Sequence, residues 1–498
     1  MDNRYGVVII GAGVVGNAIA RELSRFRIRT AVLEKEPDVG LETSCRNSGV
    51  LHSGINYKAG TLRARLAVRG NSMMDELCSD LKIKIKRIGK LTVALDKDEM
   101  GGIGRLMAQG EANGVPDLKV LDHEGIQKIQ PGAEGVAAIW SPSSAIISPY
   151  GLTVALAENA HENGAEYFLN TEVSSIKRNQ DSSFSIATVD GRIFETRILI
   201  NSAGLSSGKI SSMLGVDKSN SGESLKIWPC RGEYYVLDKR LEGSLKTLIY
   251  PVPGAKDAGL GIHLTPTVDG NILIGPSAQY IQEETPEDYK VTSAVLEDLR
   301  REGQKLLPDI KMSDFIRNFA GNRPKRTPPD VGGNGDFIIE EANAVERFIN
   351  IVGIESPGLT SAPAIAEMVR DMVSTHIQLD AKSDFIARRP GFAGHFCELP
   401  IDEQERLIRE NPEYGEIICR CEKITKKEIR DAIENPLGAK SLVSIKYRAR
   451  SGMGRCQGGF CTPRIVRMLR DEYGYLPKDY ILREADSNLF FGNVRGEE

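Results

Sequence analysis

Apolar residues at the start of the chain follow a pattern that predicts a strand, a helix and a second strand. Residues 7–10 form a continuous apolar run that leads into the glycine-rich stretch of residues 11–16. A helical pattern follows, with apolar side chains at a spacing of four, at Val15, Ile19 and Leu23. A second apolar run, residues 30–33, ends in Glu34. This order of strand, glycine turn, helix, strand and acid is typical of a dinucleotide-binding unit.

Three glycines and one acid of this unit have distinct physical roles. Gly11 permits the tight turn, Gly13 lets backbone N–H groups approach a pyrophosphate, and Gly16 allows close packing of helix and strand. Glu34 lies 18 residues after Gly16, where a carboxylate reaches the ribose hydroxyls of an adenosine. Because a carboxylate disfavours a 2′-phosphate, FAD or NAD fits this unit and NADP does not. The alternative is a glycine-rich turn that binds no ligand.

Further along the chain, two kinds of pattern alternate. Residues 148–164 read as a helix, and residues 198–204 and 348–354 as buried strands. Residues 225–320 instead hold short alternating strands separated by turn residues, as in an antiparallel sheet. We interpret this stretch as part of an inserted substrate domain. Residues 381–411 are charged and irregular, and we expect a linker there.

Bulk composition excludes several classes of protein. Of the 498 residues, 41% are apolar and 27% charged, with a net charge of −4, which is typical of a globular protein with no nucleic-acid partner. No run reaches the ~18 apolar residues that a transmembrane helix needs. Residues 6–20 resemble the core of a signal peptide, but cleavage there would delete the nucleotide turn. We therefore expect a cytoplasmic protein.

Four of the eight cysteines gather near the end of the chain, at Cys419, Cys421, Cys456 and Cys461. Four thiolates gathered in this way usually bind metal, and their spacing alone leaves zinc and an iron–sulfur cluster open. We expect the predicted helix start at Thr462-Pro463 and the nearby cations to stabilise an anionic cluster. Those cations are Lys446, Arg448, Arg450 and Arg455. The other cysteines (Cys45, Cys78, Cys230 and Cys397) are dispersed, and we expect packing or loop positions for them.

Five further motifs carry a resemblance to a known family. They are Arg-Asn-Ser-Gly-Val-Leu-His-Ser-Gly (46–54), Asn-Ser-Ala-Gly (201–204), Arg-Gly-Glu-Tyr-Tyr (231–235), Gly-Asn-Arg-Pro-Lys (321–325) and Gly-Ile-Glu-Ser-Pro-Gly-Leu-Thr (353–360). With the fingerprint, they resemble the D-amino-acid-oxidase-like FAD oxidoreductases over roughly residues 1–380. The resemblance implies FAD and not NAD. The FAD-binding residues expected from these motifs are Gly11, Gly13, Gly16, Glu34, Ser44, Asn47, Ser48, Val173, Gly204, Gly358, Leu359 and Thr360.

The cysteine region resembles the bacterioferritin-associated-ferredoxin-like [2Fe–2S] domain, which implies that the four cysteines hold such a cluster. The implied fold is an α/β Rossmann-like FAD-binding domain with an inserted antiparallel-sheet substrate domain (α+β), followed by a small helical iron–sulfur domain. We expect FAD-binding parts at about 1–80, 140–220 and 320–380, a substrate domain at about 81–139 and 221–319, a cluster domain at 412–475 and a tail at 476–498.

Within the family, the chain resembles L-2-hydroxyglutarate dehydrogenases first and the anaerobic type of glycerol-3-phosphate dehydrogenase second. The glycerol-3-phosphate enzymes usually have an arginine where this chain has Asn56 and a lysine where it has Gly358. Both missing cations suit a phosphate dianion. We therefore expect a small anionic secondary alcohol, with L-2-hydroxyglutarate or a related 2-hydroxy acid slightly ahead. The fused cluster domain favours glycerol 3-phosphate, and a non-catalytic redox relay is a third alternative.

The resemblance also implies catalytic roles. Arg231 and Arg323 would clamp a carboxylate of the substrate, and His52 or His263 would accept the hydroxyl proton, because a neutral imidazole titrates near the working pH. Electrons would leave through the cluster to a protein subunit or to a quinone- or NAD-linked partner. That partner could hold the protein at a membrane surface.

Overall fold

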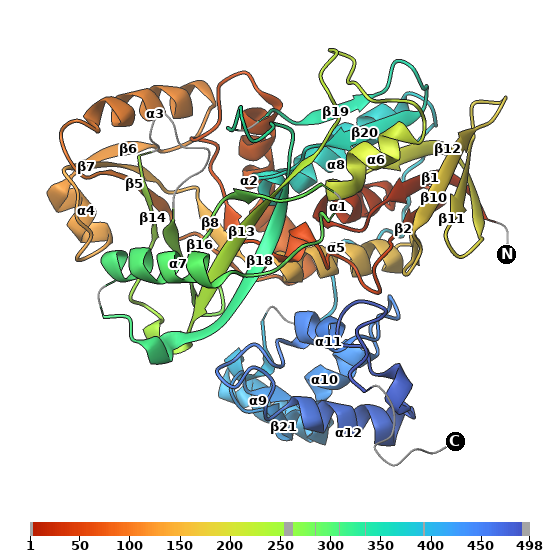
Figure 1. Cartoon of the computed structure of the whole chain (residues 1–498). Helices are drawn as coiled ribbons and strands as arrows, with labels where there is room; N and C mark the ends of the chain where they lie inside the picture. Colours follow the sequence, from red (N-terminus) through yellow and green to blue (C-terminus); the bar gives the residue numbers. More distant parts are fainter. Residues whose placement is uncertain are drawn as a thin grey trace.

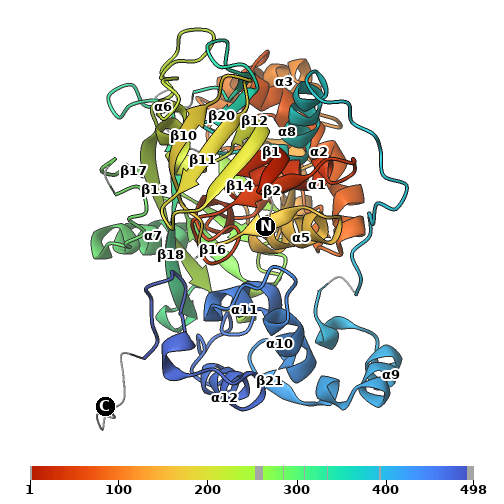
Figure 2. The same cartoon turned by 90° about the vertical axis from the view of Figure 1, so that its right-hand side faces the viewer.

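The computed structural model describes residues 3–252, 262–283, 285–307, 309–333, 335–391 and 394–490. Residues up to 391 build the larger part of the molecule, and a smaller part formed by the later residues lies beneath it (Figure 1). A quarter turn shows α11 (Leu442–Ala449) of the smaller part directed toward the larger part (Figure 2). None of the described helices is long and apolar enough to cross a membrane.

An eight-stranded sheet forms the centre of the nucleotide-binding region, and its middle strands are parallel. In β1, Val7 and Ile9 face one core while Val8 and Ile10 face the other, so the strand is buried on both sides. This explains the continuous apolar run, since parallel strands covered on both faces need no polar alternation. The strands are β1 (Arg4–Ile10), β2 (Thr30–Leu33), β9 (Glu166–Phe168), β10 (Val173–Arg178), β11 (Phe184–Thr188), β12 (Ile193–Asn201), β19 (Ile338–Glu341) and β20 (Phe348–Val352).

Helices pack on both faces of this sheet. The longer ones share one core with Val7 and Ile9, and α6 packs on the opposite face through Ile210. The predicted helix at 148–164 begins at Pro149, where Ser148 caps it by accepting a hydrogen bond from the N–H of Gly151 at 3.1 Å. These helices are α1 (Val14–Leu23), α2 (Leu62–Leu81), α5 (Pro149–Glu162), α6 (Ser207–Ser212) and α8 (Gly358–Ser374).

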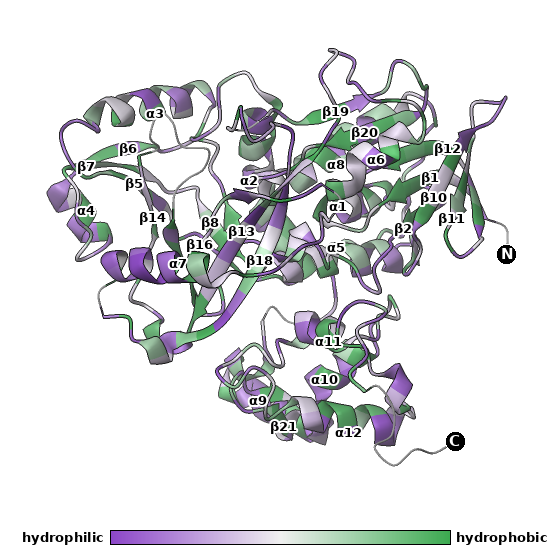
Figure 3. Ribbon diagram, viewed as in Figure 1, coloured by the Kyte–Doolittle hydropathy of each residue, from purple (hydrophilic) through white to green (hydrophobic). Residues whose placement is uncertain are grey.

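A nine-stranded sheet adjoins the first, with α7 (Ser293–Leu306) on its surface and mainly hydrophilic residues along that helix (Figure 3). The expected antiparallel order needs one correction, because β14 pairs with β5 in parallel. This strand pair joins residues 90–94 to residues 248–251, so the sheet is mixed. Its strands are β5 (Lys90–Ala94), β6 (Lys119–Asp122), β7 (Ala137–Ser141), β13 (Trp228–Leu237), β14 (Leu248–Pro251), β15 (His263–Pro266), β16 (Ile272–Gly275), β17 (Gln279–Tyr280) and β18 (Phe315–Lys325).

Smaller elements complete the larger part. A three-stranded sheet of β3 (Val50–Leu51), β8 (Ala145–Ile147) and β4 (Ile85–Lys86) fixes the segment that carries His52. Helices α3 (Met100–Ala112) and α4 (His123–Ile129) pack on opposite faces of one end of the nine-stranded sheet, through Ile103 and Ile126 (Figure 1).

The expected linker at 381–411 is not wholly irregular, because residues 401–410 form helix α9 (Ile401–Glu410). Its apolar positions are too few to predict a buried face. Ion pairs one turn apart stabilise it instead, since Arg406 pairs with Glu403 at 2.5 Å and also with Glu410. Beyond it the cluster region contains a hairpin of β21 (Ile417–Cys419) and β22 (Ile424–Thr425), then α10 (Lys426–Ile433), α11 and α12 (Thr462–Tyr473) around its own apolar core.

Candidate functional site

A cavity of about 340 Å³ extends from the glycine fingerprint to a group of buried polar residues where the two large sheets meet. Most of the residues predicted from the sequence line it. They are Gly11, Gly13, Glu34, Ser44, Asn47, Ser48, Val173, Gly204, Gly358, Leu359, His52, His263 and Arg323. Gly16, Thr360 and Arg231 do not line it.

At the fingerprint end, the backbone has the geometry that the sequence predicts. Gly11 has a φ of +98°, a conformation that favours glycine. A Cβ on Gly16 would lie 2.0 Å from the carbonyl oxygen of Gly11, so Gly16 serves helix–strand packing and not the cavity wall. Ser44 accepts a hydrogen bond from the N–H of Val14 at 2.9 Å and closes the first turn of α1.

Glu34 lies at the end of β2, with its carboxylate held by backbone groups. One oxygen accepts from the N–H of Ala12 at 2.7 Å and the other from the N–H of Glu36 at 3.0 Å. Burial raises the pKa of Glu34 to about 7. Glu34 lines the cavity at the place where the fingerprint predicts that the ribose hydroxyls bind.

His52 lies in the wall of the cavity, and α8 fixes its position. Its backbone N–H donates to Oγ1 of Thr360 at 3.0 Å, and its Nε2 lies 3.3 Å from Oγ of Ser356. Thr360 thus positions the His52 segment from behind. Burial first, and the charge of Lys90 second, lower the pKa of His52 to about 3. The imidazole is therefore neutral at physiological pH, but it does not titrate near the working pH as the sequence led us to expect.

A second group of buried residues adjoins His52, and the sequence did not predict two of them, Lys90 and Tyr250. The ring of Tyr250 lies 4.0 Å from that of His263, which is also buried. Lys90, only 1% exposed, donates from Nζ to Oδ1 of Asn56 at 2.9 Å and lies 5.1 Å from the Tyr250 ring centroid. A lysine within the apolar run of β5 is a weak sequence signal, because nothing local shows that its head group is buried.

The two predicted arginine clamps differ in position. Arg323 lines the cavity and donates to the carbonyl oxygen of Ser277 at 2.5 Å. Arg231 is buried away from the cavity, and its guanidinium pairs with Glu233 at 3.4 Å and Asp288 at 3.2 Å. Because carboxylates of the chain already occupy Arg231, its position contradicts the predicted contact with substrate.

The four clustered cysteines form two neighbouring pairs, Cys419 with Cys461 and Cys421 with Cys456. The first pair is buried and the second is exposed. Within the described residues, no three side chains of His, Cys, Asp or Glu converge closely enough to hold a metal ion as they stand. The donor set nevertheless fits an anionic cluster, because four thiols gather where backbone N–H groups point at sulfur.

Those N–H groups favour thiolates. The hydrogen bond with Cys461, together with the N–H groups of Gly452 and Glu422, lowers the pKa of Cys419 to about 6. The N–H of Phe460 similarly lowers the pKa of Cys456. Helix α12 begins immediately after Cys461, as predicted, with Pro463 in its first turn.

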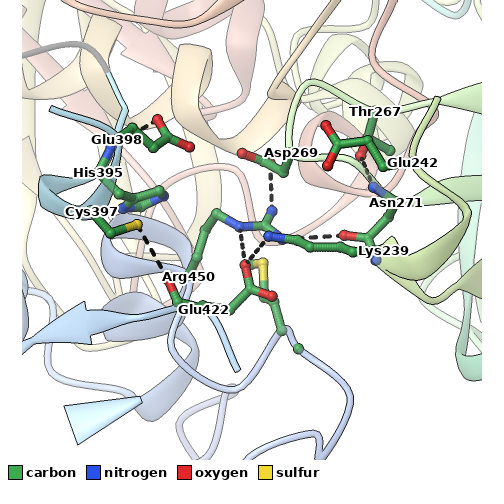
Figure 4. Close-up of polar contacts among 12 residues, drawn as sticks. Lys239, Glu242, Thr267, Asp269, Asn271, His395, Cys397, Glu398, Glu422 and Arg450 are labelled. Atoms are coloured by element: carbon green, nitrogen blue, oxygen red, sulfur yellow. Dashed lines mark hydrogen bonds and ion pairs between the residues drawn. The ribbon is translucent and has the colours of Figure 1, made fainter. Parts of the chain in front are cut away.

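The cations expected to surround the cluster mostly bind the larger part of the molecule. Arg450 is buried between Asp269, at 2.5 Å, and Glu422, at 3.0 Å, and Glu422 also pairs with Lys239 at 2.7 Å (Figure 4). Arg448 pairs with Asp38 at 2.6 Å and Glu158 at 2.8 Å. The sequence could not show these distant carboxylates. We therefore correct the expectation: these arginines mainly attach the cluster region to the larger part.

Two other contacts complete this attachment. Arg455 pairs with Asp238 at 2.8 Å, although its side chain is 59% exposed. The rings of Tyr447 and Tyr150 stack at 5.4 Å between centroids. Lys446 forms no ion pair within the described part of the chain, and burial lowers its pKa to about 7.

Comparisons with known proteins assign both halves of the chain. Residues 6–372 match the family "FAD dependent oxidoreductase", and residues 417–471 match "BFD-like [2Fe-2S] binding domain". A glycerol 3-phosphate dehydrogenase of Caloramator mitchellensis is 41% identical over 496 residues, covering 99% of both chains. A mitochondrial L-2-hydroxyglutarate dehydrogenase of Caenorhabditis elegans is 30% identical over 74% of this chain and 92% of its own.

Solved structures agree with these matches. The FAD-bound L-α-glycerophosphate oxidase of Mycoplasma pneumoniae superimposes with a TM-score of 0.70 at 27% identity, over 78% of this chain and 100% of its own. Glycine oxidase of Geobacillus kaustophilus, at 22% identity and a TM-score of 0.65, shares the fold. The open alternatives are thereby decided in favour of FAD over NAD and of a [2Fe–2S] cluster over zinc. The chain belongs to the FAD-dependent oxidoreductases, and it is an enzyme whose cofactors are FAD and a [2Fe–2S] cluster in a BFD-like domain.

Proposed function

We propose that this enzyme is a glycerol-3-phosphate dehydrogenase that passes electrons through its cluster to a separate acceptor. The observation that carries the proposal is the relative of that name, which is 41% identical and aligns across both halves of the chain. The L-2-hydroxyglutarate dehydrogenases align with about three quarters of it. This difference reverses the order expected from the sequence, in which a hydroxy acid came first.

The preference for a hydroxy acid rested on two missing cations, at Asn56 and Gly358. Position 56 does not act alone, because Lys90 of β5 contacts Asn56 directly. A lysine amino group therefore lies at this place although the arginine is absent, and a bound anion would favour its charged form. We identify no comparable lysine beside Gly358 among the described residues, and the proposed function does not rely on that position.

The chemistry that bound FAD would supply is the acceptance of a hydride from the carbon that bears the substrate hydroxyl. The cluster would supply one-electron transfer. The hydroxyl proton would pass to His52, because its imidazole is neutral, buried and part of the cavity wall. Arg323 would hold negative charge of the substrate in the same cavity. Electrons would leave on the side of Cys421 and Cys456, the exposed cysteines.

Anaerobic mixing of the purified flavoenzyme with a substrate panel tests the proposal. The panel is glycerol 3-phosphate, L-2-hydroxyglutarate, L-lactate and glycerol, and the measurement is the rate of flavin bleaching. We expect glycerol 3-phosphate to give the highest ratio of rate to Kd, with dihydroxyacetone phosphate formed in proportion to reduced flavin. Faster bleaching by L-2-hydroxyglutarate would overturn the proposal.

A further inference from the structure

We propose that Asn56 and Lys90 together recognise the anionic group of the substrate, with Asn56 donating the hydrogen bond and Lys90 supplying the charge behind it. This inference rests on the proposed function, because it assumes that the substrate carries a phosphate. It deepens that function by assigning the anion to two residues for which neither the sequence motifs nor the family matches give a role.

The first observation is a buried cation without a counter-ion. Lys90 is 1% exposed, and no carboxylate of the described residues pairs with it. Its described contacts are the amide oxygen of Asn56, at 2.9 Å, and the face of the Tyr250 ring, at 5.1 Å. Burying an ammonium group with one neutral hydrogen bond and an aromatic face is costly. This burial lowers the pKa of Lys90 to about 7. A bound anion would offset the cost of burial and keep the ammonium group charged.

The second observation is an amide nitrogen without a partner. Lysine offers only donors, so the atom of Asn56 that faces Lys90 must be its oxygen. This fixes the orientation of the amide and leaves Nδ2 on its other side. Nδ2 is buried and forms no hydrogen bond, yet Asn56 lines the cavity. A buried donor in the wall of a cavity calls for an acceptor, and a phosphate oxygen is one.

Together, Asn56 and Lys90 provide the two properties that a single arginine side chain would provide. A guanidinium offers N–H donors and a positive charge on a single side chain. Here Asn56 supplies the donor and Lys90 the charge, and their contact polarises the amide toward the cavity. Asn56 and His52 line the same cavity. An anion bound at Asn56 would therefore lie beside the proposed proton acceptor.

The experiment measures anion binding without turnover. Inorganic phosphate is titrated into the oxidised holoenzyme, and its Kd is read from the flavin difference spectrum. We expect Lys90→Met and Asn56→Leu each to raise this Kd about 10- to 100-fold, the size of one hydrogen bond to a charged group. In anaerobic reduction, the same variants should raise the Kd of glycerol 3-phosphate by a similar factor while leaving that of uncharged glycerol within about threefold.

Two further variants separate recognition from folding. Asn56→Arg in the Lys90→Met background restores donor and charge on one side chain and should recover most of the lost phosphate affinity. Lys446→Met is the matched control, since it removes another lysine whose pKa burial lowers, but one on α11 of the cluster region. It should leave the phosphate Kd unchanged. Where Lys90→Met yields no folded flavoprotein, Lys90→Arg and Asn56→Leu carry the test, with retention of affinity expected for the first and loss for the second.

Contrary outcomes are distinct from failure of the proposed function. An unchanged phosphate Kd in Lys90→Met and Asn56→Leu would overturn the inference, as would equal losses for glycerol and glycerol 3-phosphate. If the wild type instead oxidises L-2-hydroxyglutarate and not glycerol 3-phosphate, the proposed function fails. The pair is then tested with L-2-hydroxyglutarate in place of the phosphate ester, and the same variants must lose affinity for it.

Discussion

The cavity and the cysteine site differ in how far they exclude water. The cavity is assembled from both large sheets and is lined by buried polar groups such as His52 and His263, while Lys90 lies behind Asn56 of its wall. The cysteine site occupies residues 419–461, and one of its two cysteine pairs is exposed. Hydride and proton transfer benefit from excluding water, because burial strengthens every electrostatic contact. Electron exit instead requires an edge that a partner can approach. The difference implies that the two sites can be damaged independently.

The largest expected effect, and the first test of whether the two sites are independent, comes from removing the cluster. Cys456→Ser should abolish the cluster, since it removes one of four thiolates of the BFD-like domain. Iron and acid-labile sulfide analyses should fall from one [2Fe–2S] cluster per chain to near zero. Substrate should still bleach the flavin at the wild-type rate, while reduction of a one-electron acceptor should be lost. If flavin bleaching falls in parallel with iron content, the two sites are not independent.

The proton acceptor gives the next largest effect. His52→Asn should lower the limiting rate of flavin reduction about 10²–10⁴-fold, the usual size of general acid–base catalysis, with little change in substrate Kd. His263→Asn is its matched control, because that ring is also buried and lines the same cavity but packs against the ring of Tyr250. A larger loss in His263→Asn than in His52→Asn would transfer the base role to His263.

The same comparison explains what the sequence could and could not predict. The fingerprint, with Gly11 and Glu34, and the four cysteines were recognisable because each group lies within one stretch of the chain. The spacing of the cysteines left zinc open, and the family match decided for the cluster. The Asn56–Lys90 contact joins residues 34 positions apart on different elements, so no local pattern contains it. Arg231 shows the converse case. Its motif was recognisable, but Glu233 and Asp288 neutralise its charge away from the cavity, and such pairing depends on tertiary structure.

The contact between the two regions can be weakened without touching either site. Arg448→Met would leave Asp38, which is fully buried, and Glu158 without their shared partner. Breaking a buried pair in this way costs about 3–5 kcal/mol. We expect faster hydrogen exchange in α11 and slower reduction of the cluster by substrate, with flavin bleaching unchanged.

A matched variant tests whether burial decides the size of that effect. Arg455→Met removes a cation that also bridges the two regions, but its side chain is 59% exposed. An exposed pair contributes about 0–1 kcal/mol, so α11 exchange and cluster reduction should stay close to the wild type. Equal effects of the two substitutions would contradict a buried ion pair as the main attachment.

The smallest predicted effect is a pH dependence that sharpens the picture of a desolvated cavity. Burial first, and Lys90 second, lower the pKa of His52 from 6.5 to about 3. A base works in its neutral form, so the limiting rate at saturating substrate should stay level as the pH falls from 8 to 5, with no inflection near 6.5. The saturating rate is the proper measurement, because kcat/KM would also report titration of the free phosphate ester. In Lys90→Met the second cause is gone, the pKa of His52 rises, and the acid limb should begin at higher pH. Because the pKa of Lys90 is about 7, an inflection near 6.5 is assigned to the imidazole only where it persists in Lys90→Met. Such an inflection in both proteins would show a solvated imidazole and contradict the burial on which the comparison rests.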